Sequence, residues 1–447
     1  MTPPKLQSLP ERSSVSNRQA FLLRVAELLH VYGTPAFRLE RVLLKLAADL
    51  GVSASFLSTP TAVVASLAKP RDAERTGDGQ GVPSDPSAVT PPEHDEVLGR
   101  GLDDRVVHLM RCDGGQVDLG KLVEFDEVMD RVGGGELDAR AGLVQLEEIA
   151  AAPTRYHPVV GSIAFGLASA GAAVFFRGGW LEVAAVFLIS IALQLFARVT
   201  AARSDAVGLL EPVAAFGASL AAVLGAYAFG LDLRAVTLAS LIVLIPGLTL
   251  TVGFVELATR HLVSGMSRLA GAGAVFLTLL LGVALGWRLG PMLLGLEDGL
   301  AAAELARTSA AFPSWGIWGA VLVAPFAFGI VLEARPRELP VIFLASALGF
   351  AAAFVGQATL GPDLWPFLGA LVVGVVANGY ARLADRPALV PLTPGIFMLV
   401  PGSLGFRSLT SFLDADSLAG MSWAFQTGMV AASLVGGLLL ANLVLPP

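Results

Sequence analysis

The feature that most constrains this chain is a series of long apolar stretches in its last two thirds. Residues 154–447 carry 28 of the 67 Asp, Glu, Lys and Arg residues. A helix needs roughly 17–25 mostly apolar residues to cross a bilayer. Ten stretches meet that requirement: 159–176, 180–198, 211–229, 236–254, 269–288, 316–333, 338–357, 365–383, 389–409 and 424–445. The sequence therefore predicts a mostly α polytopic membrane protein with about ten transmembrane helices.

The composition excludes several classes of soluble protein. The chain is 54% hydrophobic and 15% charged, whereas soluble proteins average about 25% charged residues. No basic stripe is present, so we expect no nucleic acid partner. The single cysteine, Cys112, excludes an intramolecular disulfide and a multi-thiolate metal site. We expect no metal and no cofactor.

Residues 1–153 predict a small cytoplasmic α+β domain. They hold the whole formal charge of −7. Apolar residues at helical spacing follow Ser16, and Thr34-Pro35 begins a second helix. Strands are expected at 52–57, 63–67 and 105–111, with further helices at 119–132 and 136–151.

Two segments of this domain need separate interpretation. Residues 69–101 are rich in Pro, Asp, Glu and Gly, which predicts a disordered insertion. Residues 115–121 nearly match a phosphate-binding loop, but Leu122 stands where that loop needs a Ser or Thr for Mg²⁺. We interpret this segment as a turn before a helix.

The arginines between the spans predict the orientation. With the N-terminus inside, nine arginines fall in inner loops and five in outer loops, which is the expected direction of the positive-inside rule. The first residues do not have the pattern of a signal peptide. We expect a multi-pass protein of the cell (inner) membrane with both termini in the cytoplasm.

The ten spans form two groups of five, at 154–290 and 315–447. Because five is odd, a second copy inserts upside down relative to the first. Span four contains Pro246-Gly247 and span nine contains Pro394-Gly395. Inverted repeats with broken helices at matching positions are typical of secondary transporters. The sequence predicts two inverted five-helix repeats.

The two breaks are the predicted substrate site. Proline removes a backbone donor and glycine loosens the helix. The freed amides and carbonyls must then bind protein, water or a solute. The alternative interpretation is that Pro-Gly only kinks two packed helices. The candidate substrate-binding residues are Pro246, Gly247, Thr249, Thr251, Thr393, Pro394 and Gly395.

Few charged residues lie close to the spans. Glu256 follows the broken span four, and Arg260 is four residues further on, at the spacing of a helical ion pair. Ionisable groups in a membrane domain are candidates for function. We predict that Glu256, or less favourably Glu182, couples a proton to transport. The alternative is a structural ion pair.

Glycines repeat every four residues on span five, at Gly282, Gly286 and Gly290. Small residues at this spacing let two membrane helices approach closely. We therefore predict a close helix-packing face on this span.

Several motifs, taken in order, resemble the threonine/serine exporter family. No single motif is highly specific, but their order along a ten-span chain is. In the N-terminal part, residues 33–40 (GTPAFRLE) fit the family. The membrane motifs are His157-Pro158, 166–172 (GLASAGA), Gly178-Gly179-Trp180, 244–250 (LIPGLTL), 265–268 (GMSR), 393–403 (TPGIFMLVPGS) and 405–407 (GFR).

The resemblance runs from about residue 15 to the end of the chain. It implies a cytoplasmic N-terminal domain, ten spans and export of threonine and serine driven by the proton motive force, and no enzyme activity. Relatives split into two polypeptides are associated with dicarboxylate (succinate) export, so a dicarboxylate exporter is the alternative. The family brings no catalytic residues to this sequence.

A zwitterionic substrate needs an anion site and a cation site close together. Helix N-termini after the Pro-Gly pairs offer N–H groups to a carboxylate, and freed carbonyls accept from the ammonium. We expect alternating access by rocking of the two halves, with a small metabolite, protons and the bilayer as partners. A homo-oligomer is compatible with the sequence. Alternatives from other classes are a membrane enzyme acting on lipid and a membrane-anchored sensor.

Overall fold

The computed structural model describes residues 16–68, 105–112, 117–201, 208–295, 312–313, 315–399 and 402–446. The predicted insertion at 69–101 lies outside the described residues, as does the start of the segment 115–121. The chain forms two compact units. The smaller comprises Pro4–Gly115 and Glu124–Ala151, and the larger consists mainly of Gln116–Val123 and Ala152–Pro447.

The smaller unit combines helices with a three-stranded antiparallel sheet in the order β1-β2-β3. Ser16 caps the first helix through a reciprocal capping box with Gln19. Along β2, Val63, Ala65 and Leu67 are buried at every second position, as expected for one covered sheet face. The elements are α1 (Asn17–Val31), α2 (Ala36–Asp49), β1 (Ala54–Thr59), β2 (Ala62–Ala68), β3 (Arg105–Arg111), most of α4 (Leu119–Gly133) and α5 (Ala139–Ala151).

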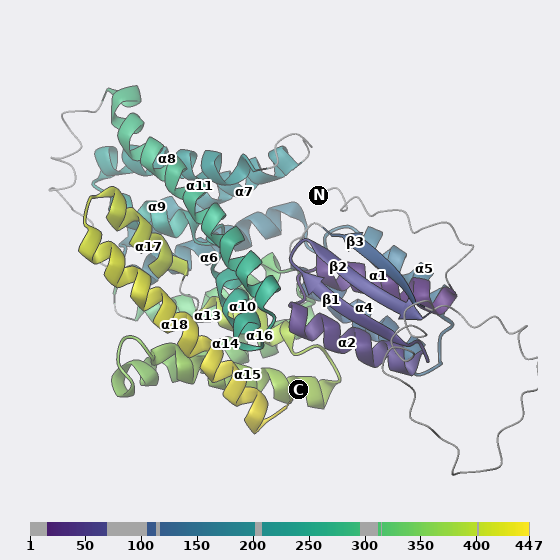
Figure 1. Ribbon diagram of the computed structural model, residues 1–447. Coiled ribbons are helices and arrows are strands. Elements are labelled where there is room, and N and C mark those ends of the chain that lie inside the picture. The colour runs from purple at the N-terminus through teal and green to yellow at the C-terminus, as the bar shows by residue number, and fades with distance from the viewer. Residues whose placement is uncertain are drawn as a thin grey trace, which may run out of the picture. The chain divides into compact units, whose positions relative to one another are not determined.

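The larger unit is built of helices (Figure 1). By length and apolar composition, eight of its described helical segments could cross a membrane, whereas α10 and α13 are shorter. The first set is α6 (Pro158–Phe175), α7 (Trp180–Ala201), α8 (Leu210–Phe229), α9 (Leu233–Leu241), α10 (Gly247–Ala258) and α11 (Leu262–Leu294). The second set is α13 (Gly316–Val331), the 3₁₀ turn η1 (Pro336–Glu338), α14 (Leu339–Thr359), α15 (Trp365–Ala384), α16 (Leu389–Phe397), α17 (Gly402–Leu413) and α18 (Ser417–Val444).

Two predicted spans are each divided into a short helix and a longer one. The span predicted at 236–254 consists of α9, with 9 residues, and α10, with 12. The span predicted at 389–409 consists of α16, with 9 residues, and α17, with 12. The second break falls between Phe397 and Gly402, because α16 continues through Pro394 and Gly395.

The glycine face predicted on α11 is confirmed. A Cβ at Gly282 would collide with the carbonyl oxygen of Pro212 on α8, and one at Gly286 would collide with Ser219. A Cβ at Gly290 would only touch α8, at 3.4 Å. The first two glycines therefore allow α8 and α11 to pack with their backbones close together.

A polar junction surrounds the start of α4 and the end of α13 within the larger unit. The Leu119 amide donates to the carbonyl of Leu332 (2.9 Å). The side chain of Glu333, which has a left-handed backbone (φ 57°), accepts from the Arg155 amide at 2.8 Å. Burial raises the pKa of the neighbouring Asp118 to about 6. Part of this junction therefore titrates in the acidic range.

Candidate functional site

The two breaks meet at a pair of glycines. A Cβ added to Gly402, the first residue of α17, would lie 3.1 Å from the Cα of Gly247, the first residue of α10. It would also lie 2.8 Å from Cγ2 of Ile245. A side chain at 402 would crowd both Ile245 and the backbone of Gly247. Glycine at this position thus lets the N-termini of both half-helices converge.

Converging helix N-termini favour an anion. Pro246 caps α10 without a side-chain hydrogen bond, and the first helical bond runs from Leu250 N–H to the Pro246 carbonyl (3.0 Å). The amides of Leu248 and Thr249 therefore belong to the first turn, where no intrahelical carbonyl can accept them. Each N-terminus also carries about half a positive charge. Two such ends together attract a carboxylate.

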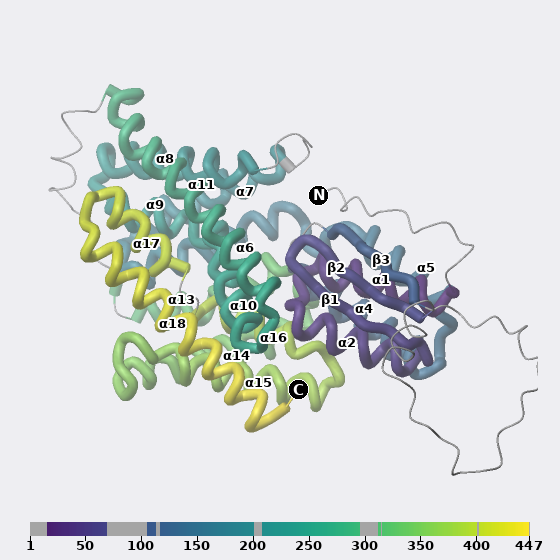
Figure 2. The backbone as a smooth tube through the Cα atoms, viewed as in Figure 1, coloured from purple at the N-terminus to yellow at the C-terminus, as the bar shows by residue number. Residues whose placement is uncertain are grey.

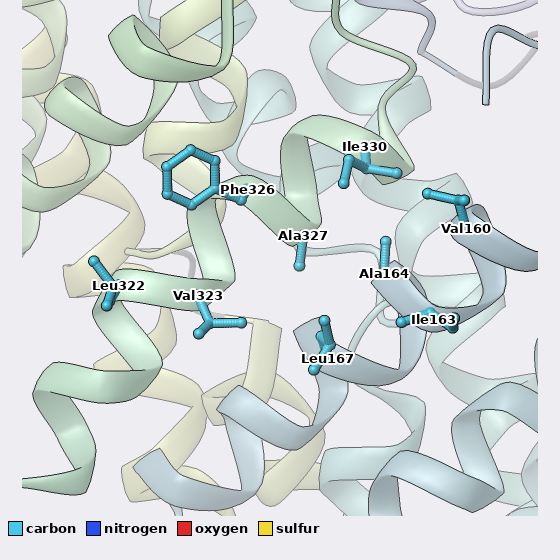
Figure 3. A pocket seen from close by; sticks show the side chains of 9 residues that line it. All are labelled: Val160, Ile163, Ala164, Leu167, Leu322, Val323, Phe326, Ala327 and Ile330. Atoms are coloured by element: carbon cyan, nitrogen blue, oxygen red, sulfur yellow. The ribbon is translucent and has the colours of Figure 1, made fainter. Parts of the chain in front are cut away.

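The broken spans run in opposite directions past each other. Leu248 of α10 packs against a buried cluster that includes Ile396 in α16 and Leu399 just after that helix. Leu241 of α9 shares a buried cluster with Phe406 of α17. Figure 2 shows α10 beside α16. The second helix of the first broken span thus lies beside the first helix of the second, and α9 and α17 contribute to one buried cluster.

The candidate residues of the first break surround this meeting point. Pro246 and Gly247 form it, and Thr249 lies half-buried in the first turn of α10. Thr251 is only 2% exposed, and its hydroxyl donates to the Gly247 carbonyl at 3.1 Å. The Thr251 hydroxyl therefore stabilises its own helix end.

The candidate residues of the second break lie one turn away, inside α16. Thr393, Pro394 and Gly395 are buried, and a Cβ on Gly395 would lie 2.7 Å from Cγ1 of Val373 on α15. Close packing against α15 thus accounts for glycine at 395. The residues that begin the second half-helix, Gly402 and Ser403, were missing from the predicted site, although the Pro401-Gly402 pair was visible in the sequence.

Glu256 is completely buried near the end of α10. Its carboxylate accepts from Nε of Arg268 at 2.9 and 3.0 Å and from the Ser264 hydroxyl at 2.8 Å. The sequence spacing pointed to Arg260, but that residue occupies a left-handed turn (φ 67°) after the helix has ended. The chain reverses there, so α11 supplies the charged partner.

Glu182 is also buried, at 3% exposure, in the first turn of α7. It accepts from the Gly179 amide at 2.9 Å and from the Asp232 amide at 3.3 Å. The carboxylate therefore caps α7 and ties it to the residue that caps α9.

These features define a class of protein. A polytopic helical unit with two interrupted, oppositely directed spans whose half-helix N-termini meet has the architecture of a membrane transporter. Two sequence-family models of threonine/serine exporters (ThrE) match the chain. The first covers residues 102–290 and the second covers residues 318–444. The chain belongs to the threonine/serine exporter family, whose members are transporters and not enzymes.

The curated relatives are longer fungal proteins called pheromone-regulated membrane protein 10. The protein of Debaryomyces hansenii is 25% identical over 441 residues, which is 95% of this chain and 40% of the relative. The protein of Saccharomyces cerevisiae is 25% identical over 97% of this chain and 55% of the relative. The chain thus spans about half or less of these proteins. No solved structure matches it.

Proposed function

We propose that this protein is a secondary transporter that exports a small metabolite bearing a carboxylate, with threonine and serine as the first candidates. Family membership gives the class of transporter. The observation that carries the site is the meeting of Gly247 and Gly402 at the starts of α10 and α17. A carboxylate held there would receive N–H groups from two helix ends at once.

We further propose that the membrane domain consists of two inverted five-helix repeats, 154–290 and 315–447, with ten spans in all. Equal lengths support this: α8 and α15 have 20 residues each, and both broken spans divide into 9 and 12. Contacts also recur 155 positions later. Gly282 meets Pro212, Ala215 and Phe216, and Gly437 meets Phe367, Ala370 and Leu371.

The proposed mechanism is alternating access, in which the repeats rock against each other around the meeting point. The amides of the first turns hold the substrate carboxylate, and carbonyls released at the breaks accept from the ammonium. The hydroxyls of Thr249 and Ser403, both partly exposed in first turns, are placed to contact the substrate hydroxyl. Thr393, Pro394 and Gly395 support the site from α16.

Proton coupling is assigned to Glu256, with Glu182 as the second candidate. Protonation of Glu256 would remove the negative charge that pairs with Arg268, and so would loosen the connection between α10 and α11. Glu256→Gln should then abolish export driven by a pH gradient while substrate binding remains. Uphill export by this variant at the wild-type rate would exclude Glu256 as the coupling group.

The arginine distribution supports a cell (inner) membrane location with both termini and residues 1–153 in the cytoplasm. A sensor would need the N-terminal domain for every response, whereas a transporter retains solute flux without it. Deletion of residues 1–150 separates the two. Complete loss of flux from a variant that is correctly inserted would favour the sensor.

A dicarboxylate such as succinate is the second candidate substrate. The specific observation in its favour is that two positive helix ends converge, which suits a solute with two carboxylates as well as a zwitterion. The substrates differ in their need for a cation site, which only the amino acids have.

The decisive experiment is efflux from proteoliposomes loaded with threonine, serine or succinate, with and without a pH gradient. We expect saturable efflux of threonine and serine that the gradient accelerates. Gly402→Leu should block it, while Gly271→Leu is the matched control, because a Cβ at Gly271 meets nothing within 4 Å. Failure to export any of the three solutes from protein-containing vesicles would overturn the proposal.

A further inference from the structure

Arg407 is a cation that the proposed mechanism does not use. It lies in the second turn of α17, five residues after Gly402, which corresponds to about 8 Å along the helix axis. Its side chain is partly buried. Its guanidinium carbon lies 5.1 Å from the ring centre of Phe176 and 5.7 Å from that of Trp423.

The positive charge of Arg407 is not matched by a directly paired carboxylate among the described residues. Among the residues that the structure describes, no carboxylate forms an ion pair with it, and Asp232 acts on it only as a nearby charge. The two aromatic faces stabilise the cation but accept none of its N–H groups in the plane of the guanidinium. A partly desolvated arginine in a membrane domain with free donors is characteristic of a ligand site.

Two other arginines of the larger unit are paired with carboxylates. Arg268 donates to the buried carboxylate of Glu256. Arg234 is 62% exposed and pairs with Asp414 at 2.8 Å. Both therefore have their charge matched by the protein itself, and Arg234, whose partner Asp414 follows the end of α17, offers a control.

A carboxylate is the ligand group that the donors of Arg407 fit best. A guanidinium presents a planar fork of donors that matches the two oxygens of a carboxylate. The N-terminus of α17 already attracts the same group about 8 Å away along the helix. Phe176 belongs to the first set of helices and Trp423 to the second, so a rocking motion of the two halves would change the surroundings of Arg407.

We propose that Arg407 is a second binding station for the substrate carboxylate, reached from the helix N-termini along α17. This inference rests on the proposed function, since it assumes a carboxylate-bearing solute that passes the meeting point. In the bound state the carboxylate lies in the plane of the guanidinium and accepts from its N–H groups.

Trp423 provides a direct measurement, because it contacts the guanidinium. Purified full-length protein is titrated with threonine, succinate and threonine amide, and tryptophan fluorescence is followed. The signal of Trp423 is the part that Trp423→Phe removes. We expect both carboxylates, but not the amide, to change this signal. Arg407→Gln should abolish the change or weaken the apparent affinity about 10- to 100-fold.

Arg407→Lys should retain a weaker response, because lysine keeps the charge but not the planar fork. This variant is also a control for the possibility that Arg407→Gln loses its response by misfolding. Arg234→Gln should respond as the wild type. The inference is overturned if Arg407→Gln keeps the full response, if the amide gives the same response, or if no carboxylate changes the Trp423 signal. If the wild type exports the solute and the Arg407→Gln variant exports it at the same rate, this inference alone is refuted. If the Trp423 signal responds to a carboxylate but no efflux occurs, only the transport function is refuted.

Discussion

Replacing Gly402 by alanine tests whether the two half-helices must meet. The new Cβ would lie 3.1 Å from the Gly247 Cα and 2.8 Å from a methyl group of Ile245. Overpacking of this kind costs about 1–3 kcal/mol, whereas alanine gains up to about 1 kcal/mol over glycine in a helix. The net expectation is a loss of about 0–3 kcal/mol and a displacement of one helix N-terminus from the other.

Transport should suffer more than stability. Because the site consists of two sets of amides aimed at one carboxylate, we expect efflux from proteoliposomes to fall about tenfold or more in Gly402→Ala. The control is Gly271→Ala on α11, where the added methyl meets nothing within 4 Å. Efflux is normalised to inserted protein, and unfolding is followed by intrinsic fluorescence. Equal efflux and stability in the two variants would refute the idea that contact at 402 organises the site.

Three further predictions follow from other contacts. Arg268→Gln should destabilise the protein by about 3–5 kcal/mol because it removes the guanidinium that pairs with the buried Glu256 carboxylate, and Glu256→Gln in the same chain should recover part of the loss; a double variant no more stable than Arg268→Gln would contradict this. Gly286→Val should lower the unfolding temperature by separating α11 from Ser219, unlike Gly271→Val, and equal melting of the two would count against the packing face. Burial raises the pKa of Asp118 from 3.8 to about 6, so the folded protein binds this proton more tightly than the unfolded chain does. Local stability should therefore fall by up to about 3 kcal/mol as pH rises from 4 to 7. Asp118→Asn should remove this dependence, as measured by hydrogen exchange at residues 119–121, and an unchanged pH profile would exclude Asp118 as its source.

Some elements were predictable because they depend on neighbours in the sequence. The capping residue of α1 and the apolar runs of α6, α7, α8 and α15 are local properties, and the predicted ranges agree with the helices to within a few residues. The glycine spacing on α11 was equally informative. A helix that repeats glycine every fourth residue presents one thin face regardless of which helix covers it.

The two breaks were only partly predictable. Pro246-Gly247 ends one helix and begins another, as expected, but Pro394-Gly395 remains within α16. A proline removes one hydrogen bond in either case, so the sequence alone does not distinguish a tolerated proline from an interruption. In the structure Gly395 packs closely against Val373 of α15.

Ion pairs and converging ends required the tertiary structure. Because the chain reverses after α10, Glu256 pairs with Arg268 of α11, a pairing that helical spacing does not reveal. Likewise Gly247 and Gly402 are far apart in sequence; the matching breaks predicted one shared site, but not which residues meet there.

The sequence by itself determined that this chain is a helical membrane protein, since bilayer thickness and hydrophobicity act on each segment separately. Only the tertiary structure decided which polar groups face each other, because buried charges and helix ends find their partners through packing between segments distant in the chain.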